Sequence, residues 1–378
     1  MEISDTARRL HSDSLVIDAH VHPSLKTYLF KKKLWKSHRS GGAFNPFTMR
    51  VDLPKTIAGG VDALVSSIYL PERGLLDDCK LLKIASKIGP KRMRKLFKGD
   101  PLERTLEILS SFESAVNKAN SKGRELARIV RSTDELVQAQ SDRVIAIVHA
   151  VEGGHSLGGR PESVEILSQR GVCMLTLAHF YINEVVAPVV GIPTDMQKLG
   201  CFKQPKDLDK GLGPIGPAVV EEMLRLGMII DLTHCTPNAR EQIYDLCGTR
   251  RPLMFSHVGV QPLAVDPMSP TEDEIRHIAD TGGVVAVIFM NYWLGVHDSK
   301  DGLDSIVATV KHIAKIGGID AVAFGSDFDG FTDPPDDIKD VSQMPRLTAA
   351  LLDAGFSEAD VGKILGGNME RVLRTGWR

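Results

Sequence analysis

Two histidines at the end of a predicted buried strand are the first candidates for chemistry in this 378-residue chain. The strand has the sequence Leu15-Val-Ile-Asp-Ala-His20, and His22 follows two residues later. Side chains two positions apart in a strand point to the same side, so we expect His20 and His22 to enter one cleft. Two imidazoles in one cleft suggest a metal, although an isolated His-x-His is as often a core histidine beside a surface one.

Later predicted strand ends carry side chains of the same chemical kinds, namely Glu152, His234, His257 and Asp327. Together they supply imidazoles for a borderline metal such as zinc, one carboxylate able to bridge two ions, and one acid for proton transfer. The set therefore predicts a site for two metal ions.

Short apolar runs alternate with segments of helical period, which is typical of parallel strands joined by crossover helices. Eight strands are predicted at 15–20, 61–70, 144–151, 172–178, 228–232, 253–255, 284–289 and 321–324. Helices are predicted at 101–122, 161–170, 217–226, 237–247, 271–281, 303–316, 341–354 and 357–365. Eight alternations favour an α/β fold of the (β/α)₈ TIM-barrel type over an open sheet. Residues 1–378 are expected to form one such domain, with the ligand set at the C-terminal strand ends.

Two long basic connections interrupt this alternation, at about 23–55 and 71–100. They contain Lys31-Lys-Lys-Leu-Trp-Lys-Ser-His-Arg39 and Lys91-Arg-Met-Arg-Lys-Leu-Phe-Lys98. The simplest interpretation is a pair of solvated insertions. Because they follow the first two strands they should lie over the active-site face, and a functional role there would be recognition of an anionic group.

The composition is that of a globular, enzyme-sized protein, with 43% hydrophobic and 25% charged residues. A net charge of -2 predicts no general attraction to nucleic acid or to acidic membranes. Five cysteines without a Cys-x-x-Cys pair predict no disulfide framework. The N-terminus has no basic start followed by an apolar core, and no apolar run approaches about 18 residues. These features predict a soluble, cytoplasmic protein.

Two other motif matches point to different chemistry. Gly154-His-Ser-Leu-Gly158 fits the nucleophile elbow of serine hydrolases and follows a strand, but the next helix signal begins only at Pro161. Gly211-Leu-Gly-Pro-Ile-Gly216 fits a dinucleotide-binding loop, but no strand precedes it and a proline interrupts it. A serine hydrolase remains the stronger of these two alternatives.

Several longer motifs resemble the membrane dipeptidase (peptidase M19) family of the amidohydrolase superfamily, from about Leu15 to Arg374. They are Ile-Asp-Ala-His (17–20), Asp-Leu-Pro with Ala-Gly-Gly-Val (52–61), Val-Glu-Gly-Gly-His-Ser-Leu-Gly-Gly (151–159), Leu-Thr-Leu-Ala-His (175–179), Leu-Gly-Met-Ile-Ile-Asp-Leu-Thr-His (226–234), Phe-Ser-His (255–257), Gly-Ser-Asp-Phe-Asp-Gly (325–330) and Gly-Gly-Asn (366–368). The resemblance implies a barrel with two zinc ions that hydrolyses dipeptides and tolerates a D-residue on the C-terminal side. Mn²⁺ and Co²⁺ are alternative metals.

The resemblance also assigns roles by position. It implies His20 as a ligand of the first metal, Glu152 as the bridge between both metals, and His234 and His257 as ligands of the second. Asp327 corresponds to the acid/base that would take a proton from a metal-bridging hydroxide and return it to the departing amine. His179 corresponds to a histidine that contacts the substrate and would hydrogen-bond the oxyanion, and Asp18 is expected to orient a ligand imidazole.

Two positions depart from the family pattern. His22 stands where the family usually has Asp, so the first metal site loses a negative charge, although His-x-His is usual in the wider superfamily. Met268 stands where the family commonly has an arginine that holds the substrate carboxylate, and methionine cannot replace that charge. Either the basic insertions supply the cation, or the substrate is not an ordinary free dipeptide.

Several alternatives therefore stay open. The same site could cleave another amide, an N-acyl amino acid, a lactone or a phosphoester, or the chain could bind metal without turnover. The expected partner is a small-molecule substrate, with no nucleic acid and no membrane, and a homodimer is one candidate for the oligomeric state.

Overall fold

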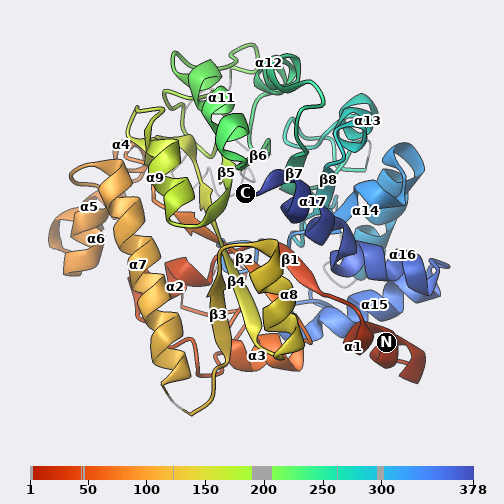
Figure 1. Ribbon diagram of the computed structural model, residues 1–378. Coiled ribbons are helices and arrows are strands. Elements are labelled where there is room, and N and C mark those ends of the chain that lie inside the picture. Colours follow the sequence, from red (N-terminus) through yellow and green to blue (C-terminus); the bar gives the residue numbers. More distant parts are fainter. Residues whose placement is uncertain are drawn as a thin grey trace.

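The computed structural model shows a nearly closed barrel of parallel strands surrounded by helices (Figure 1). The structure describes residues 3–43, 45, 47–121, 123–189, 207–261, 263–295 and 302–378. Neighbouring strands follow the order β1-β2-β4-β5-β6-β7-β8-β9, and β3 pairs with β4 outside this path. The predicted TIM barrel is confirmed, and its eight strands are β1 (Ile17–Val21), β2 (Ala63–Tyr69), β4 (Ile145–Glu152), β5 (Val172–Thr176), β6 (Ile229–Asp231), β7 (Leu253–Val258), β8 (Val284–Val287) and β9 (Val322–Phe324).

Each predicted strand corresponds to one of these eight, and every residue in them is buried. Strands of a parallel barrel are covered on both faces, and they therefore appear in the sequence as apolar runs rich in β-branched residues. The additional strand β3 (Ala127–Val130) was not predicted, because its alternation of half-buried residues is weak.

The predicted helices correspond to α7 (Pro101–Asn120), α9 (Ser163–Gln169), α11 (Gly216–Leu226), α12 (Pro237–Cys247), α13 (Glu272–Asp280), α14 (Gly302–Gly317), α15 (Met344–Asp353) and α16 (Glu358–Gly362). Their starts follow from local chemistry. The Thr236 side chain accepts from the backbone of Ala239 with Pro237 at the first helical position, and Thr271 forms a capping box with Glu274.

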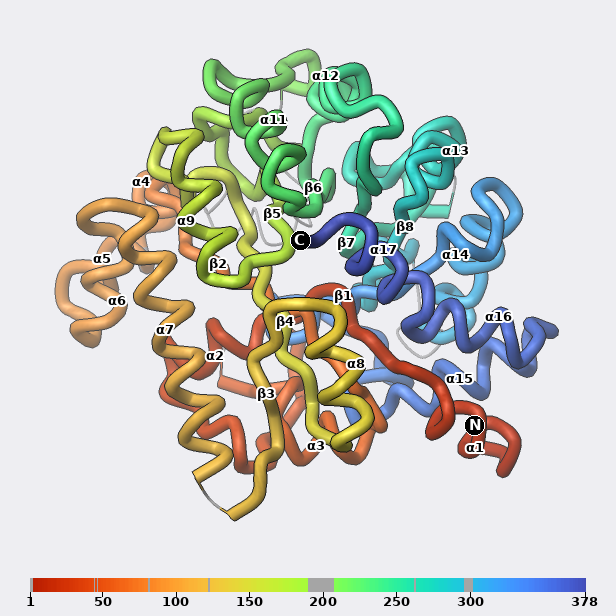
Figure 2. The backbone as a smooth tube through the Cα atoms, viewed as in Figure 1, coloured from red at the N-terminus to blue at the C-terminus, as the bar shows by residue number. Residues whose placement is uncertain are grey.

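The sequence prediction omitted α1 (Asp5–Asp13), α8 (Thr133–Ser141) and α17 (Asn368–Gly376). It also assigned no helix to the two basic insertions, but both of them contain helices. The first contains α2 (Pro23–Phe30) and α3 (Leu53–Ala58), and the second contains α4 (Gly74–Asp78), α5 (Lys80–Ile88) and α6 (Lys91–Leu96). In Figure 2 the chain of α5 and α6 lies at the rim of the molecule, outside α7.

The barrel closes between its first and last strands through hydrogen bonds beside the predicted site. The backbone N–H of Asp327 donates to His20 O at 2.9 Å, and that of His22 donates to Phe328 O at 2.9 Å. The Asp18 carboxylate accepts from the Ser326 hydroxyl at 2.6 Å and from its backbone N–H at 2.9 Å. The first and last strands of the barrel are thus joined beside the candidate ligands.

Cysteine chemistry differs from the expectation at one position. Cys79 is disulfide-bonded, whereas Cys173, Cys235 and Cys247 are free and buried; Cys201 lies outside the described residues.

Among the helices that the structure describes, none combines the length and apolar character needed to cross a bilayer.

Candidate metal centre

The predicted metal ligands come together at the C-terminal ends of the barrel strands. His20 is in β1, His22 follows it, Glu152 ends β4, His234 follows β6, and His257 is in β7. All five are buried, with at most 2% of the residue surface exposed. Parallel strands bring residues that are far apart in the chain to one rim, as the barrel prediction required.

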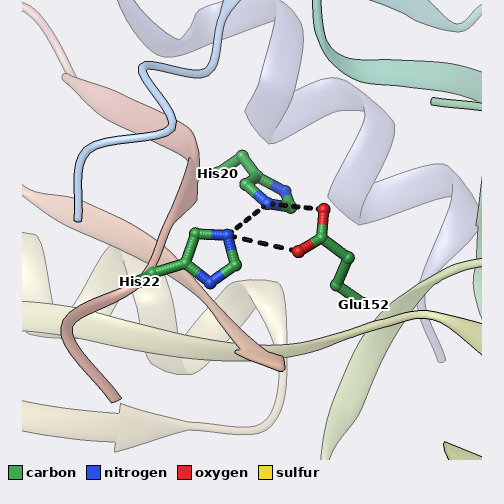
Figure 3. A group of neighbouring side chains, drawn as sticks. All are labelled: His20, His22 and Glu152. Atoms are coloured by element: carbon green, nitrogen blue, oxygen red, sulfur yellow. Dashed lines mark hydrogen bonds and ion pairs between the residues drawn. The ribbon is translucent and has the colours of Figure 1, made fainter. Parts of the chain in front are cut away.

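The Glu152 carboxylate lies at the centre of this group. Its Oε1 lies 3.4 Å from His20 Nε2, and its Oε2 lies 3.3 Å from His22 Nε2 (Figure 3). Oε1 also lies 3.5 Å from Nε2 of both His234 and His257. One carboxylate therefore faces two pairs of imidazoles.

The imidazoles themselves are paired at short distances. His20 Nε2 and His22 Nε2 lie 3.0 Å apart, and His234 Nε2 and His257 Nε2 lie 3.1 Å apart. Two nitrogens on one tetrahedral zinc ion, each about 2.0 to 2.1 Å from it, would lie about 3.3 Å apart. Each pair together with Glu152 satisfies the spacing of a metal-ligand group, so the donor set suits two cations that share one carboxylate.

Burial and neighbouring charges give these groups the protonation states that ligands need. Burial would raise the pKa of Glu152, but His179, His20 and His22 hold it well below its ordinary value. Burial lowers the pKa of His234 and, far more strongly, that of His257, which keeps both imidazoles neutral. Burial opposes a charge on His20, yet Glu152 raises its pKa to about 9, so a metal must displace a proton there.

Asp327 lies at the edge of the ligand group, three residues beyond β9. Its Oδ1 lies 3.2 Å from His22 Nε2, and the residue is 7% exposed. Its backbone is in the left-handed region with φ 54°, which is uncommon for a residue other than glycine. A side chain at Gly330 would force the Asp327 carboxylate to move, because its Cβ would lie 2.1 Å from Asp327 Oδ1. The loop thus holds a carboxylate against the ligands at the cost of backbone strain.

His179 lies beside the same carboxylate, beyond the end of β5. Its Nε2 is 3.7 Å from Glu152 Oε2, and its Nδ1 donates to Glu72 Oε1 at 2.9 Å. Burial disfavours its charged form, but Glu152 and Glu72 raise its pKa. The imidazole therefore carries an N–H toward the site.

The sequence prediction missed Glu72, which follows β2. Its carboxylate accepts from the Tyr69 hydroxyl at 2.5 Å and from the backbone N–H of Phe180 at 2.9 Å, besides the bond from His179. Burial would raise its pKa, but His179 lowers it to about 2. A buried acid at a barrel strand end could have been a signal, but its partner is 107 residues away in the chain.

Asp231 and Ser256 were also missed. Asp231 ends β6 and is fully buried, and its Oδ2 accepts from the Ser256 hydroxyl at 2.6 Å. Ser256 Oγ also lies 3.2 Å from His20 Nδ1 and 2.8 Å from His257 Nδ1. An acid inside an apolar strand, as in Met-Ile-Ile-Asp-Leu, is a sequence signal that could have identified Asp231.

Asp18 was expected to orient a ligand imidazole, but its carboxylate contacts backbone N–H groups and the Ser326 hydroxyl instead of an imidazole ring. The carboxylate accepts from the backbone N–H of His20 at 3.3 Å and from Ser326. The His20 ring nitrogen instead faces Ser256. Asp18 thus acts on His20 through the backbone and through the closure of the barrel.

The elbow serine shows no activation. Ser156 is fully buried in a short 3₁₀ turn, and its Oγ has no hydrogen-bond partner among the described residues. The neighbouring His155 Nε2 bonds to Leu70 O at 2.6 Å instead. The geometry therefore does not support a serine nucleophile here.

The chain was compared with known proteins. It is 32% identical over 232 residues to an uncharacterised dipeptidase of Schizosaccharomyces pombe, a match covering 61% of this chain and 53% of that relative. It is 28% identical to the dipeptidase tcpJ of Claviceps purpurea over 86% of this chain and 68% of that protein. The matched part is thus about half the length of the first relative.

The fold also matches solved structures over its whole length. A metallopeptidase of Rhodobacter sphaeroides, solved with a phosphinate mimic of the dipeptide L-Ala-D-Ala, superposes with a TM-score of 0.76 at 20% identity, covering 97% of this chain and 100% of that one. The family model described as membrane dipeptidase (peptidase family M19) matches residues 4–376. The chain therefore belongs to the membrane dipeptidase family, peptidase family M19.

Proposed function

We propose that this protein hydrolyses dipeptides with two zinc ions held by His20, His22, Glu152, His234 and His257. The observation that carries the proposal is the position of Glu152, whose carboxylate lies 3.3 to 3.5 Å from Nε2 of all four histidines. Its Oε2 faces His22, and its Oε1 faces His20, His234 and His257. A structural site would be closed by its protein ligands, whereas two ions sharing one carboxylate leave positions for water and substrate.

Metal ions in such a site would lower the pKa of a bound water and polarise the peptide carbonyl. The chain's own residues then have separable tasks. Asp327, 3.2 Å from His22 Nε2, is placed to take the proton of the attacking water and to deliver it to the departing amine. His179, fixed by Glu72, is placed to donate a hydrogen bond to the oxygen on which negative charge develops.

The proposed substrate is more specific than what membership in the family implies. A dipeptide with a D-residue on its C-terminal side agrees with the family resemblance and with the L-Ala-D-Ala mimic held by the Rhodobacter protein. The mimic is a property of that protein, and here it only directs which substrates to test first.

A second candidate is a substrate without a free carboxylate, and the surroundings of Met268 favour it. Met268 is fully buried, and its backbone carbonyl accepts from Arg240 Nη1 at 3.2 Å. Arg240 is itself buried and forms an ion pair with Glu274 at 2.8 Å. Since the guanidinium is already engaged, it does not replace the missing carboxylate clamp. Amides, lactones and phosphoesters are therefore tested beside dipeptides. N-acyl amino acids, which keep a free carboxylate, are included for comparison.

Binding without turnover is the remaining alternative. Strained backbone in the left-handed region is maintained mainly at functional sites, and both Asp327 and His234 have it, with φ 54° and 68°. A purely structural metal site would not need the additional carboxylate of Asp327, which supports catalysis.

The test is a kinetic screen of the zinc, manganese and cobalt forms on L,L and L,D dipeptides, their C-terminal amides and the other substrate classes. We expect Asp327→Asn to retain both metal ions and to lose at least about a hundredfold in kcat. Equal rates on free dipeptides and their amides would exclude carboxylate recognition. Full activity in Asp327→Asn, or no activity of the wild type on any class, would refute the proposed mechanism.

Location and assembly remain predictions. Buried free thiols are usual in a reducing compartment, whereas a disulfide such as that of Cys79 is usual in an oxidising one. Fractionation of the native host, with detection of the protein in each fraction, tests the predicted cytoplasmic location. Light scattering on the purified protein tests for a homodimer, and electrophoretic mobility with DNA and RNA tests the expected lack of nucleic-acid binding.

A further inference from the structure

The segment from Lys80 to Lys98 has an unusual charge for this protein. It contains eight lysines and arginines in nineteen residues and no aspartate or glutamate, although the whole chain has a net charge of -2. It forms α5 and α6 with the turn between them, which we call the cationic hairpin. The average charge of the protein therefore hides a strongly basic surface.

Most of these cations are not used within the fold. Lys95 lies 3.8 Å from Glu107, and Arg92 donates to Tyr28 O at 2.9 Å. The other six, which form no salt bridge among the described residues, are Lys80, Lys83, Lys87, Lys91, Arg94 and Lys98. All six are exposed. A group of unpaired like charges repels itself unless an anionic partner lies against it.

The solvent-facing side of α5 also exposes large apolar side chains. Ile84 is 55% exposed and Ile88 is 81% exposed. Lys80, Ile84 and Ile88 are four residues apart, as are Lys83 and Lys87, so the five form two adjoining rows on one face. Isoleucines this exposed contribute little to the hydrophobic core. Their burial therefore does not explain why apolar residues stand beside the lysines on the outer face.

The hairpin is fixed to the barrel at its base. Leu96 and Phe97 are buried in the hydrophobic core, and the Arg92 guanidinium lies 5.1 Å from the centre of the Tyr28 ring in α2. The Tyr181 hydroxyl donates to Asp78 at 3.0 Å and joins the preceding α4 to the loop after β5. In Figures 1 and 2, α5 and α6 lie at the periphery, where a large flat partner can reach them.

We propose that the cationic hairpin docks the protein on an anionic lipid surface, with Ile84 and Ile88 entering the interfacial layer and the lysines contacting lipid headgroups. An interfacial segment needs basic side chains and exposed apolar ones on the same face, and α5 has both. A polyanion such as nucleic acid would use the lysines but would gain little from aliphatic side chains. In the chain, the hairpin lies between β2 and α7, so it belongs to a connection that starts at the C-terminal strand ends.

The test is co-sedimentation of the full chain with vesicles of phosphatidylcholine alone or mixed with phosphatidylglycerol. We expect binding only to the mixed vesicles, weaker at high salt. Each basic residue near an anionic surface contributes a factor of about five, so Lys83→Glu with Lys87→Glu should weaken binding at least about 25-fold. Ile84→Ser with Ile88→Ser should weaken it about tenfold or more, since the apolar contribution is lost.

The matched control is Lys311→Glu with Lys315→Glu, an exposed pair with the same spacing on α14. This variant should bind mixed vesicles like the wild type, and thermal unfolding should show that all variants fold. Equal weakening by both lysine pairs would overturn the proposal, as would wild-type affinity of the isoleucine variant. Binding of the wild type to heparin or polyglutamate but not to mixed vesicles would overturn it in favour of an acidic macromolecule.

Discussion

The hydroxyl of Ser256 donates to Asp231 Oδ2 at 2.6 Å, and this single bond determines the orientation of two candidate ligands. A hydroxyl has one hydrogen, so its oxygen is left to accept from the Nδ1–H groups of His20 and His257 at 3.2 and 2.8 Å. Once a metal has displaced the second proton of His20, both imidazoles can present the Nε2 lone pair on the side of Glu152. The relation links β1, β6 and β7 through one buried serine.

We therefore predict that Ser256→Ala weakens metal binding without unfolding the protein. Loss of such a supporting bond typically costs about 10- to 100-fold in metal affinity. Competition with a chromophoric zinc chelator measures the effect. Ser163→Ala is the matched control, since Ser163 is equally buried but donates to Leu157 O, away from the ligands. Unchanged zinc affinity in Ser256→Ala would show that the serine does not set the ligand tautomers.

Glu72→Gln should reduce turnover while leaving the metal content intact. The carboxylate holds His179 through the Nδ1–H bond, and His179 is outside the proposed ligand set. An amide accepts this bond more weakly and removes the charge that helps keep His179 protonated, so we expect kcat to fall about 10- to 100-fold. Steady-state kinetics with metal analysis on the same sample provide the measurement.

Tyr69→Phe is the comparison for that variant, because it removes only the hydroxyl donated to Glu72 and leaves the carboxylate in place. Its effect on kcat should be clearly smaller than that of Glu72→Gln. Loss of metal in Glu72→Gln, or a larger defect in Tyr69→Phe, would contradict a role of Glu72 in orienting His179.

His22→Asp should strengthen binding of the first metal. The substitution restores the carboxylate that is usual in the family and adds a negative charge beside the ion. We expect an increase of about tenfold or more in the affinity of the weaker zinc site, measured by stepwise titration. His22→Asn has the same size as the aspartate but no charge, and it should bind this metal more weakly than the wild type. Tighter zinc binding by both variants would show that the smaller size of the side chain, and not its charge, increases the affinity.

The barrel could be predicted from the sequence because each of its strands is buried along its full length and appears as an apolar run. That the candidate ligands lie together followed from the same rule, since strand ends meet at one rim. By contrast, α5 and α6 lie in a connection that was interpreted only by its charge, and β3 has two half-buried residues in a strand of four.

The supporting residues of the centre could not be predicted in the same way. Glu72 and Asp231 can be noticed in the sequence as acids at strand ends, whereas Ser256 is an ordinary polar residue. The roles of all three depend on partners brought together by the barrel. Ser256 and His20 are 236 residues apart. Chain spacing carries no information on such a contact until the order and register of the strands are known.

Asp62→Asn should stabilise the protein at neutral pH. Asp62 is half-buried before β2, where its carboxylate accepts from the backbone N–H of Val16 at 2.8 Å, and burial raises its pKa to about 6. An acid with a raised folded-state pKa binds its proton more tightly in the folded than in the unfolded chain. Its ionisation therefore costs stability as the pH rises from about 4 through 6, and an amide, which still accepts the bond, avoids that cost.

We expect the stability difference between Asp62→Asn and the wild type to grow by about 1 kcal/mol between pH 4.5 and pH 7, a value reduced for the partial exposure of the group. Urea unfolding in the presence of a chelator measures it without a contribution from metal binding. Asp13→Asn, at an exposed carboxylate on the same face, is the control and should show no such growth. Because all other titrating groups are shared with the wild type, parallel stability curves for Asp62→Asn would mean that this carboxylate is not penalised by burial.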